Sequence, residues 1–191
     1  MSVDPVGLQI VMYPHPVLRK RASPVGPVTD EVRAVARRMI ELMNEAEGIG
    51  LAAPQVGLSW RLFVVDVPHS DKPEDGHSLT SEPISATRGP EVYIDPAFSD
   101  PERDLVPFEE GCLSLPEIRG EVRRPSRITV TATNLEGQRV SVRGGGLLAR
   151  CWQHEMDHLD GTLILDRMMQ IDRMKNRQAI KELEDRGRRS G

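Results

Sequence analysis

The five residues from His154 to His158 restrict what this chain can fold into more than any other part of its sequence. They read His-Glu-Met-Asp-His, and on a helix the first and fifth residues lie on one face, about one turn apart. Both imidazoles can therefore reach one metal ion. Glu155 is rotated by about 100° from His154. Its carboxylate would lie beside the ion, where it can hold and deprotonate a bound water without being a ligand.

The residues around this motif indicate that its helix is buried. Residues 147–159 form an apolar stretch that we expect to be helical, and it contains Cys151, Trp152 and Met156. Two histidines and a glutamate in such a place need partners, because burying them unpaired is costly. The alternative is a solvated helix that carries two histidines by accident, which we expect about once in a hundred chains of this size. We therefore interpret the motif as a metal site.

A catalytic site of this kind needs a third protein ligand and one open position for water. A common metalloprotease pattern places a third histidine where this chain has Ile164, and no downstream glutamate has a suitable spacing. A cysteine thiolate would suit zinc or iron. Cys151 precedes His154 by three residues on the same helical face, and Cys112 lies in a glycine-containing segment that we expect to be a strand or loop. These residues alone leave both cysteines open as ligands.

The rest of the hydrophobic pattern predicts short strands and outer helices. Residues 30–47 have helical periodicity, with Thr29 as the N-cap and Gly48 as the end. Residues 48–57 predict an irregular loop, and the three glycines at 144–146 predict a hinge. Strands are expected at 62–67, 92–94, 128–133 and 139–142, the last two joined by a turn at 134–137.

These elements predict an α+β fold, in which short antiparallel strands surround a central metal-binding helix, with a helix at each end of the chain. The length of 191 residues suits one domain, residues 1–191. Within it, residues 68–90 carry little apolar content and predict an exposed surface insertion. Residues 166–191 predict a charged C-terminal helix and tail.

The composition excludes some classes of protein. The net charge of -4 argues against a general nucleic-acid binder, so we expect no DNA partner. The sequence contains no apolar run of about 18 residues, so we expect no membrane span, and no apolar stretch near the N-terminus is long enough for us to expect a signal peptide. Two cysteines do not make a disulfide framework. A cytoplasmic location is expected.

Three segments together resemble the peptide deformylase family. Residues 48–55 read GIGLAAPQ, like the family's G-x-G-x-A-A-P-Q, and residues 110–114 read EGCLS, identical to the family's motif. Residues 153–161 read QHEMDHLDG, like Q-H-E-x-D-H-L-x-G. All three match without a substitution and in the family's order, and the similarity extends roughly from Pro14 to Leu165.

The resemblance implies a role for each site residue. It implies Cys112, His154 and His158 on the metal, with water in the fourth position, and Glu155 as the general base and acid. The side chain of Gln55 and the backbone N–H of Leu113 would donate to the developing oxyanion. The substrate peptide would contact the backbone of Gly50 and the side chain of Arg119, and Ile49 would help to shape a pocket for methionine.

The implied activity is removal of the N-formyl group from the N-terminal formylmethionine of newly made polypeptides, with release of formate. One divalent metal ion per chain is implied, Fe²⁺ in the cell, with Zn²⁺, Ni²⁺ or Co²⁺ able to substitute. N-formylmethionyl nascent peptides are the implied partners. The segment after Leu165 holds eight basic and five acidic residues, so we expect a solvated helix, with transient ribosome contact as the functional alternative.

Two other functions compete with this one. A general zinc endopeptidase would use the same helix motif, although Ile164 replaces the third histidine of that class. A structural metal site in a ribosome-associated binding protein would need four protein ligands, and it would leave Glu155 without a role.

Overall fold

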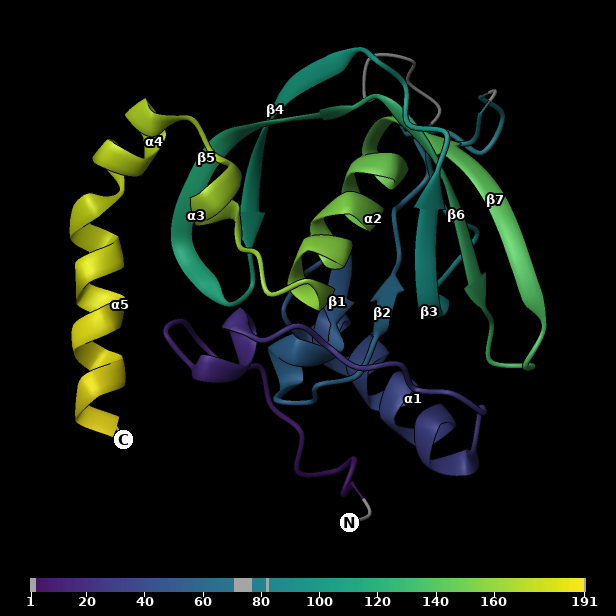
Figure 1. Cartoon of the computed structure of the whole chain (residues 1–191), viewed down its shortest axis with the longest axis horizontal. Helices are drawn as coiled ribbons and strands as arrows, with labels where there is room; N and C mark the ends of the chain where they lie inside the picture. The colour runs from purple at the N-terminus through teal and green to yellow at the C-terminus, as the bar shows by residue number, and fades with distance from the viewer. Residues whose placement is uncertain (1–2, 71–76, 82, 191) are drawn as a thin grey trace.

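A central helix, α2 (Gly146–Leu159), organises the fold. The computed structural model describes residues 3–70, 77–81 and 83–190, and in it α2 lies between a five-stranded sheet and a two-stranded sheet (Figure 1). The larger sheet has the order β1-β2-β3-β6-β7, and every neighbouring pair in it is antiparallel. Its strands are β1 (Gly50–Ala52), β2 (Leu62–Val65), β3 (Glu91–Ser99), β6 (Arg127–Thr133) and β7 (Arg139–Gly145).

Strand β2 shows why the larger sheet is covered on both faces. Its four residues are all buried, and successive side chains of a strand point to opposite faces. Phe63 and Val65 pack in the cluster that contains α2, whereas Leu62 and Val64 pack in the cluster that contains α1 (Asp30–Glu45). The continuous apolar run of β2 therefore reflects a helix on each side of the sheet.

The smaller sheet is a hairpin of β4 (Leu105–Cys112) and β5 (Leu115–Pro125). Its turn brings the end of β4 against α2. Behind β5 lies a third apolar cluster, to which the 3-10 helix η1 (Pro16–Arg19), α3 (Ile164–Arg167) and α5 (Arg177–Ser190) contribute. The short helix α4 (Gln170–Lys175) lies between α3 and α5 in the chain and has no buried residue.

The predicted α+β class is confirmed, with antiparallel strands around α2 and helices at both ends of the chain. Local signals were accurate: the Thr29 hydroxyl accepts a hydrogen bond from the Val32 N–H at 3.3 Å, and β6 and β7 meet across the expected turn. Helix α1 ends at Glu45, two residues earlier than predicted.

The predicted glycine hinge at 144–146 is wrong. Gly144 and Gly145 end β7, and Gly146 begins α2. A Cβ added at Gly144 would lie 2.3 Å from the Trp152 ring. The glycine is therefore needed for close packing of strand and helix.

The predicted irregular loop at 48–57 is also wrong in part. Gly50–Ala52 is strand β1, and Ala53–Val56 is the 3-10 helix η2. Strand β1 forms because β2 lies beside it, a partner that the local sequence does not reveal. The long strands β4 and β5 were missed for the same kind of reason, since most of β4 is exposed and lacks a buried apolar face.

Part of the predicted exposed insertion at 68–90 is anchored to the body of the protein. Ser85, Ala86 and Thr87 are buried, and the Thr87 hydroxyl accepts a hydrogen bond from the Val67 N–H at 2.9 Å. Residues 71–76 and 82 lie outside the described part of the chain, so the prediction for them is not addressed.

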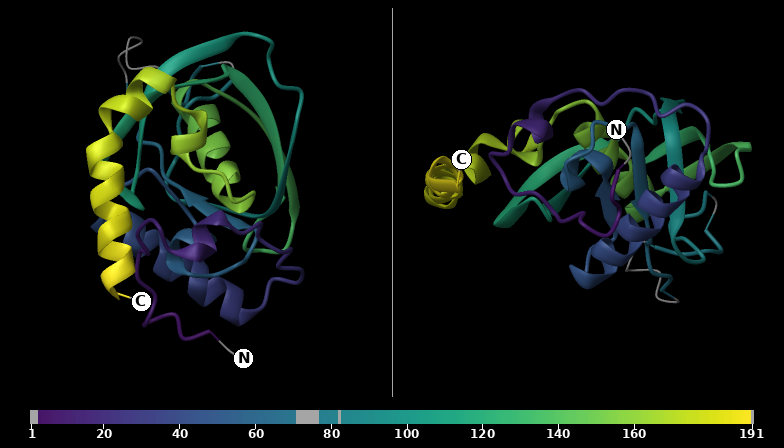
Figure 2. Two further views of the ribbon diagram at one scale, coloured as in Figure 1. Left: turned by 60° about the vertical axis from the view of Figure 1, so that its left-hand side comes forward. Right: turned by 90° about the horizontal axis from the view of Figure 1, so that it is seen from below.

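The predicted C-terminal helix is divided into three pieces. The backbone is extended at Met168 after α3 and leaves the helical conformation again at Asn176 after α4. Both views of Figure 2 place α5 at the outer edge of the molecule. Within the described residues, no helix is both long enough and apolar enough to cross a membrane.

Candidate metal centre

Three side chains from two separate parts of the chain converge beside α2. Cys112 comes from the end of β4, and His154 and His158 come from successive turns of α2. The possible ligand atoms of these three residues all lie within 4.8 Å of one another. The Cys112 Sγ lies 3.3 Å from the His158 Nε2.

This group fits a tetrahedral metal ion. Bonds of about 2.3 Å to sulfur and about 2.1 Å to nitrogen would place the two ligand atoms about 3.5 Å apart, close to the observed 3.3 Å. Burial holds the pKa of His158 well below its usual range, and His154 lowers it further. A neutral imidazole is the form that binds a metal. Three protein ligands leave a fourth position for water, as in catalytic sites.

The orientation of His154 is set by a buried network of charges. Its Nδ1 lies 3.0 Å from the Glu110 Oε2, so the ring N–H points to the carboxylate and Nε2 is directed to the metal position. Arg124 donates to both oxygens of Glu110, at 2.7 and 2.9 Å, and also to Asp157 at 2.8 Å. Arg150 donates to the Glu110 Oε1 at 2.7 Å.

These contacts hold the Glu110 carboxylate in its charged form. Burial alone would raise its pKa, but Arg124 and His154 bring the pKa well below its usual range. Sequence reasoning missed this network. Glu110 and Asp157 belong to the motifs at residues 110–114 and 153–161, yet nothing in their spacing identifies Arg124 and Arg150 as partners.

Glu155 lies next to the ligands without joining them. It is buried, and its Oε2 has no hydrogen-bond partner among the described residues. Burial raises the pKa of Glu155 to about 7, although His154 and Arg124 act in the opposite direction. A carboxylate with a pKa near neutrality suits proton transfer at neutral pH.

Gly50 provides the space that Glu155 occupies. A Cβ added at residue 50 would lie 2.4 Å from the Glu155 Oε1 and 2.7 Å from the Cys151 Sγ. Real Cβ atoms do not approach other atoms so closely. A residue without a Cβ is therefore needed at position 50, because a larger one would displace the Glu155 carboxylate. Gly50 also lines the cavity of the site.

Gln55 lies in the site, not on the surface, and it is only 1% exposed. Its Oε1 accepts a hydrogen bond from the Ala52 N–H at 2.8 Å, which fixes the direction of the amide. The Nε2 lies 3.6 Å from the Cys112 Sγ and 3.4 Å from the Ser114 Oγ. The amide therefore presents an N–H beside the metal position.

A cavity of about 500 Å³ opens beside these groups. Leu113, from the turn between β4 and β5, lines it together with Ile49, Gly50 and Arg119. The further lining side chains include Phe108, Leu115, Ile118 and Leu147. The structure therefore brings all nine site residues predicted from the sequence to one place.

The two cysteines, both of which the sequence left open as ligands, have different surroundings. The Cys151 thiol points to β1 and donates to the Ile49 carbonyl oxygen at 3.3 Å. Burial, followed by the charge of Glu155, raises the pKa of Cys151 well above its usual value, so the thiolate form that binds metals is disfavoured. Cys112 is the cysteine in the ligand group.

Comparison with known proteins identifies the family. The profile of the family described as Polypeptide deformylase matches residues 8–174. The chain belongs to the polypeptide deformylase family. A peptide deformylase of Acinetobacter baumannii is 42% identical over 176 residues, which cover 92% of this chain and 91% of that protein. A second relative, peptide deformylase 2 of Gloeobacter violaceus, is 44% identical over 152 residues, 80% of this chain and 74% of that protein.

Solved structures of the deformylase family agree with this assignment. The crystal structure of peptide deformylase from Ehrlichia chaffeensis superposes with a TM-score of 0.81 at 33% identity, covering 96% of this chain and 98% of that one. A plant peptide deformylase, PDF1B, gives a TM-score of 0.84 at 32% identity, covering 100% of this chain and 95% of that one. The prediction of a metal-dependent hydrolase of the deformylase family is confirmed.

The two competing functions receive no support from the site. Ile164, which occupies the position of the third histidine in the endopeptidase pattern, is buried among apolar residues behind β5. Within the described residues, the ligand group contains three members, one fewer than a closed structural site needs.

Proposed function

We propose that the group formed by Cys112, His154, His158 and Glu155 is where this hydrolase removes the N-formyl group from formylmethionine at the start of new polypeptides. The observation that carries the proposal is a buried carboxylate, Glu155, with one unpartnered oxygen beside a Cys-His-His group. We propose that residues 1–191 act as one domain in this reaction.

A divalent metal held by Cys112, His154 and His158 would supply Lewis acidity, which makes water nucleophilic near neutral pH and polarises the formyl carbonyl. Glu155 takes the proton of the attacking water at its free oxygen. It later delivers that proton to the amine that leaves from the formyl carbon. A pKa of about 7 allows the same carboxylate to act first as a base and then as an acid.

The oxygen of the formyl group gains negative charge in the transition state. The Gln55 amide N–H beside Cys112 meets that charge, together with the backbone N–H of Leu113. A preorganised donor of this kind contributes about 2.7–4 kcal/mol to catalysis. Gln55 is suited to this role because the Ala52 N–H holds its carbonyl oxygen and leaves Nε2 directed into the site.

The cavity has surfaces for both the methionine side chain and the peptide that follows it. Ile49, Leu147 and Phe108 provide apolar surface for the methionine side chain, where one missing methylene costs about 1–3 kcal/mol. The backbone of Gly50 and the side chain of Arg119 lie at the same cavity and contact the peptide that follows the methionine.

We propose Fe²⁺ as the metal used in the cell, with Zn²⁺, Ni²⁺ and Co²⁺ as possible substitutes, because one thiolate and two imidazoles suit each of these ions. New polypeptides are the substrate, so we place the enzyme in the cytoplasm. Transient ribosome contact through α5 completes the proposal, supported by the exposed basic side chains of Lys181, Arg188 and Arg189.

The activity is tested by formate release from formyl-Met-Ala-Ser, using protein loaded with Fe²⁺ under anaerobic conditions. Glu155→Ala is compared with Glu136→Ala, which replaces an exposed glutamate in the turn after β6. We expect Glu155→Ala to keep its metal and lose activity, and Glu136→Ala to resemble the unmodified chain. Absence of formate release from the folded, metal-loaded chain would contradict the proposed function.

Ribosome contact is tested by a salt titration of ribosome binding. We expect the combined change of Arg188 and Arg189 to glutamate to weaken binding most at low salt, since phosphate contacts are strongly screened. Binding that does not depend on these charges would exclude α5 as the docking element.

A further inference from the structure

The outer edge of β5 is covered by α4. Strand β4 pairs with one edge of β5, and α4 lies beside β5 on the other side from the larger sheet (Figure 1). Three hydrogen bonds join α4 and its flanking residues to the backbone of β5. The Met169 N–H donates to the Glu121 carbonyl at 3.0 Å, the Glu121 N–H donates to the Asp172 Oδ2 at 3.0 Å, and the Asn176 Nδ2 donates to the Arg119 carbonyl at 2.7 Å.

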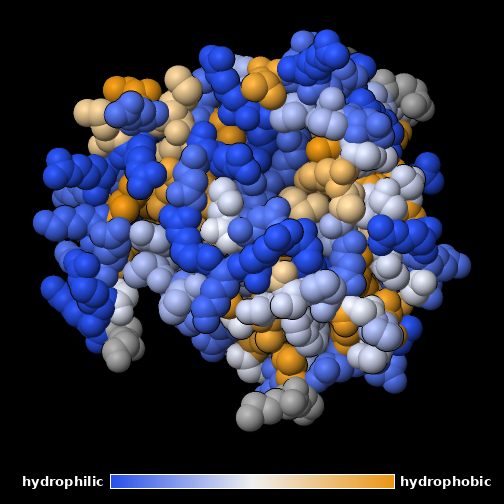
Figure 3. Space-filling model, in the orientation of Figure 1, coloured by the Kyte–Doolittle hydropathy of each residue, from blue (hydrophilic) through white to orange (hydrophobic). Residues whose placement is uncertain are grey.

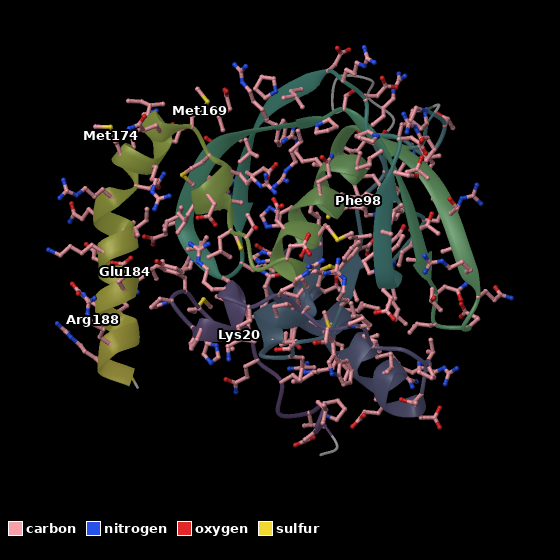
Figure 4. The ribbon with its side chains drawn as sticks, in the orientation of Figure 1. Lys20, Phe98, Met169, Met174, Glu184 and Arg188 are labelled. Carbon is pink, nitrogen blue, oxygen red and sulfur yellow. The ribbon has the colours of Figure 1, made fainter. Side chains whose placement is uncertain are left out.

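These hydrogen bonds, and not burial of its own side chains, hold α4 against β5. None of the six residues of α4 is buried. Ile171 and Met174 are 56% and 66% exposed, and Met169, just before the helix, is 42% exposed. Met169 and Met174 are labelled on the outer side of this segment in Figure 4. The Glu121 N–H and Lys175 hold the pKa of the Asp172 carboxyl below its usual range, as expected for a carboxylate that accepts a backbone hydrogen bond.

The edge that α4 covers carries a residue of the substrate site. Arg119 lies on β5 directly opposite Gly111, and its side chain extends over that glycine: a Cβ added at Gly111 would lie 3.6 Å from the Arg119 Nη1. Arg119 lines the cavity, but its side chain is exposed and no side-chain hydrogen bond orients it among those described. The position of its backbone therefore matters for where the guanidinium can reach.

We propose that Asn176 and Asp172 are positioning residues for peptide binding. They form hydrogen bonds with the Arg119 carbonyl and the Glu121 N–H. These bonds fix the backbone of β5 in the position from which the Arg119 side chain reaches the substrate peptide. The C-terminal segment is thereby coupled to the substrate site without touching the substrate. The inference rests on the proposed function, in which Arg119 contacts the peptide.

The test compares Asn176→Ala with Gln178→Ala, since each change removes one side-chain amide from the same part of the chain. Gln178 is exposed and, within the described part of the chain, donates to Glu182 of the same helix, α5, at 3.2 Å. With formyl-Met-Ala-Ser, we expect Asn176→Ala to raise KM about fivefold with kcat unchanged, the change that corresponds to one hydrogen bond of about 1 kcal/mol. Gln178→Ala should leave both constants unchanged.

Two further variants separate positioning from a loss of stability. In an Arg119→Ala background, Asn176→Ala should have no additional effect on KM, because the residue through which it acts is gone. Asp172→Ala should speed hydrogen exchange of the Glu121 amide, whatever its effect on activity.

The outcomes distinguish this inference from the proposed function. If the unmodified chain releases formate and Asn176→Ala matches Gln178→Ala, the inference is wrong and the function stands. The inference also fails if Asn176→Ala raises KM equally with and without Arg119, or if Arg119→Ala leaves KM unchanged. If the unmodified chain releases no formate, the proposed function itself fails, and the exchange rate of Glu121 still reports whether α4 protects β5.

Discussion

Helices α2 and α5 have the same length, 14 residues, but opposite surroundings. Eleven residues of α2 are buried. Among the side chains of α5 that the structure describes, one is buried, that of Leu183. In the space-filling view the edge formed by α5 is mostly hydrophilic (Figure 3). Both helices carry many charged groups, so the difference lies in where the charges are placed and how they are paired.

Ion pairs of the same kind therefore contribute very differently to the stability of the fold in the two helices. Asp157 of α2 and its partner Arg124 are 11% and 6% exposed at their side chains. The pair of Asp185 and Arg188 in α5 is 42% and 66% exposed. Removing one partner of a buried pair leaves an uncompensated charge away from water, whereas an exposed charge is simply solvated again.

The largest effect should come from the ligand that joins β4 to α2. We expect Cys112→Ser to lose bound metal and formate release, because the soft thiolate ligand is removed. Cys151→Ser should keep its metal, since its thiol contacts the Ile49 carbonyl. The check is the ratio of metal to protein after dialysis. Equal metal loss in both variants would contradict the distinction between the two cysteines.

The next largest effect should come from the buried charge network. Arg124→Met leaves Glu110 and Asp157 without this partner, and we expect it to lower the free energy of unfolding by about 3–5 kcal/mol. Arg123→Met is the matched control, because the Arg123 side chain, next to Arg124 on β5, is 58% exposed and the expected change is within about 0.5 kcal/mol. Urea unfolding of both variants measures the difference. Similar changes in the free energy of unfolding for the two variants would show that burial does not determine how much such an ion pair stabilises the fold.

A smaller effect, confined to catalysis, should follow from Gly50→Ala. The added Cβ would displace the Glu155 carboxylate, and we expect kcat to fall about 10- to 100-fold, since a group misplaced by about 1 Å can cost about 100-fold. Metal content should stay the same. Gly7→Ala serves as the control, because its nearest contact would be an ordinary 3.4 Å. An unchanged kcat would mean that Glu155 does not need its present position.

The smallest effect should come from α5. Arg188→Ala removes the exposed pair with Asp185, and we expect the free energy of unfolding to change by less than about 0.5 kcal/mol. Urea unfolding in the same buffer as the Arg124 series provides the measurement. A loss of several kcal/mol would show that this exposed ion pair of α5 stabilises the fold far more than its exposure predicts.

Much of the candidate site could be predicted from the sequence because its key features are local. His154, Glu155 and His158 share a helix, so their spacing alone places two ligands and a carboxylate together. The cap at Thr29 and the turn between β6 and β7 are also local, and both were predicted correctly. The family resemblance then supplied the roles that we propose for Cys112, Gln55 and Arg119, which no spacing in this chain could supply.

By itself, the sequence determined that a buried helix would present two imidazoles and a carboxylate to one metal ion. Only the tertiary structure decided which cysteine joins them, because Cys112 and His158 are 46 residues apart and meet through the packing of β4 against α2. It also decided which arginines neutralise Glu110 and what covers the edge of β5. Such contacts depend on strands and helices that form at a distance, since β-strand pairing and buried ion pairs have no local signal in the chain.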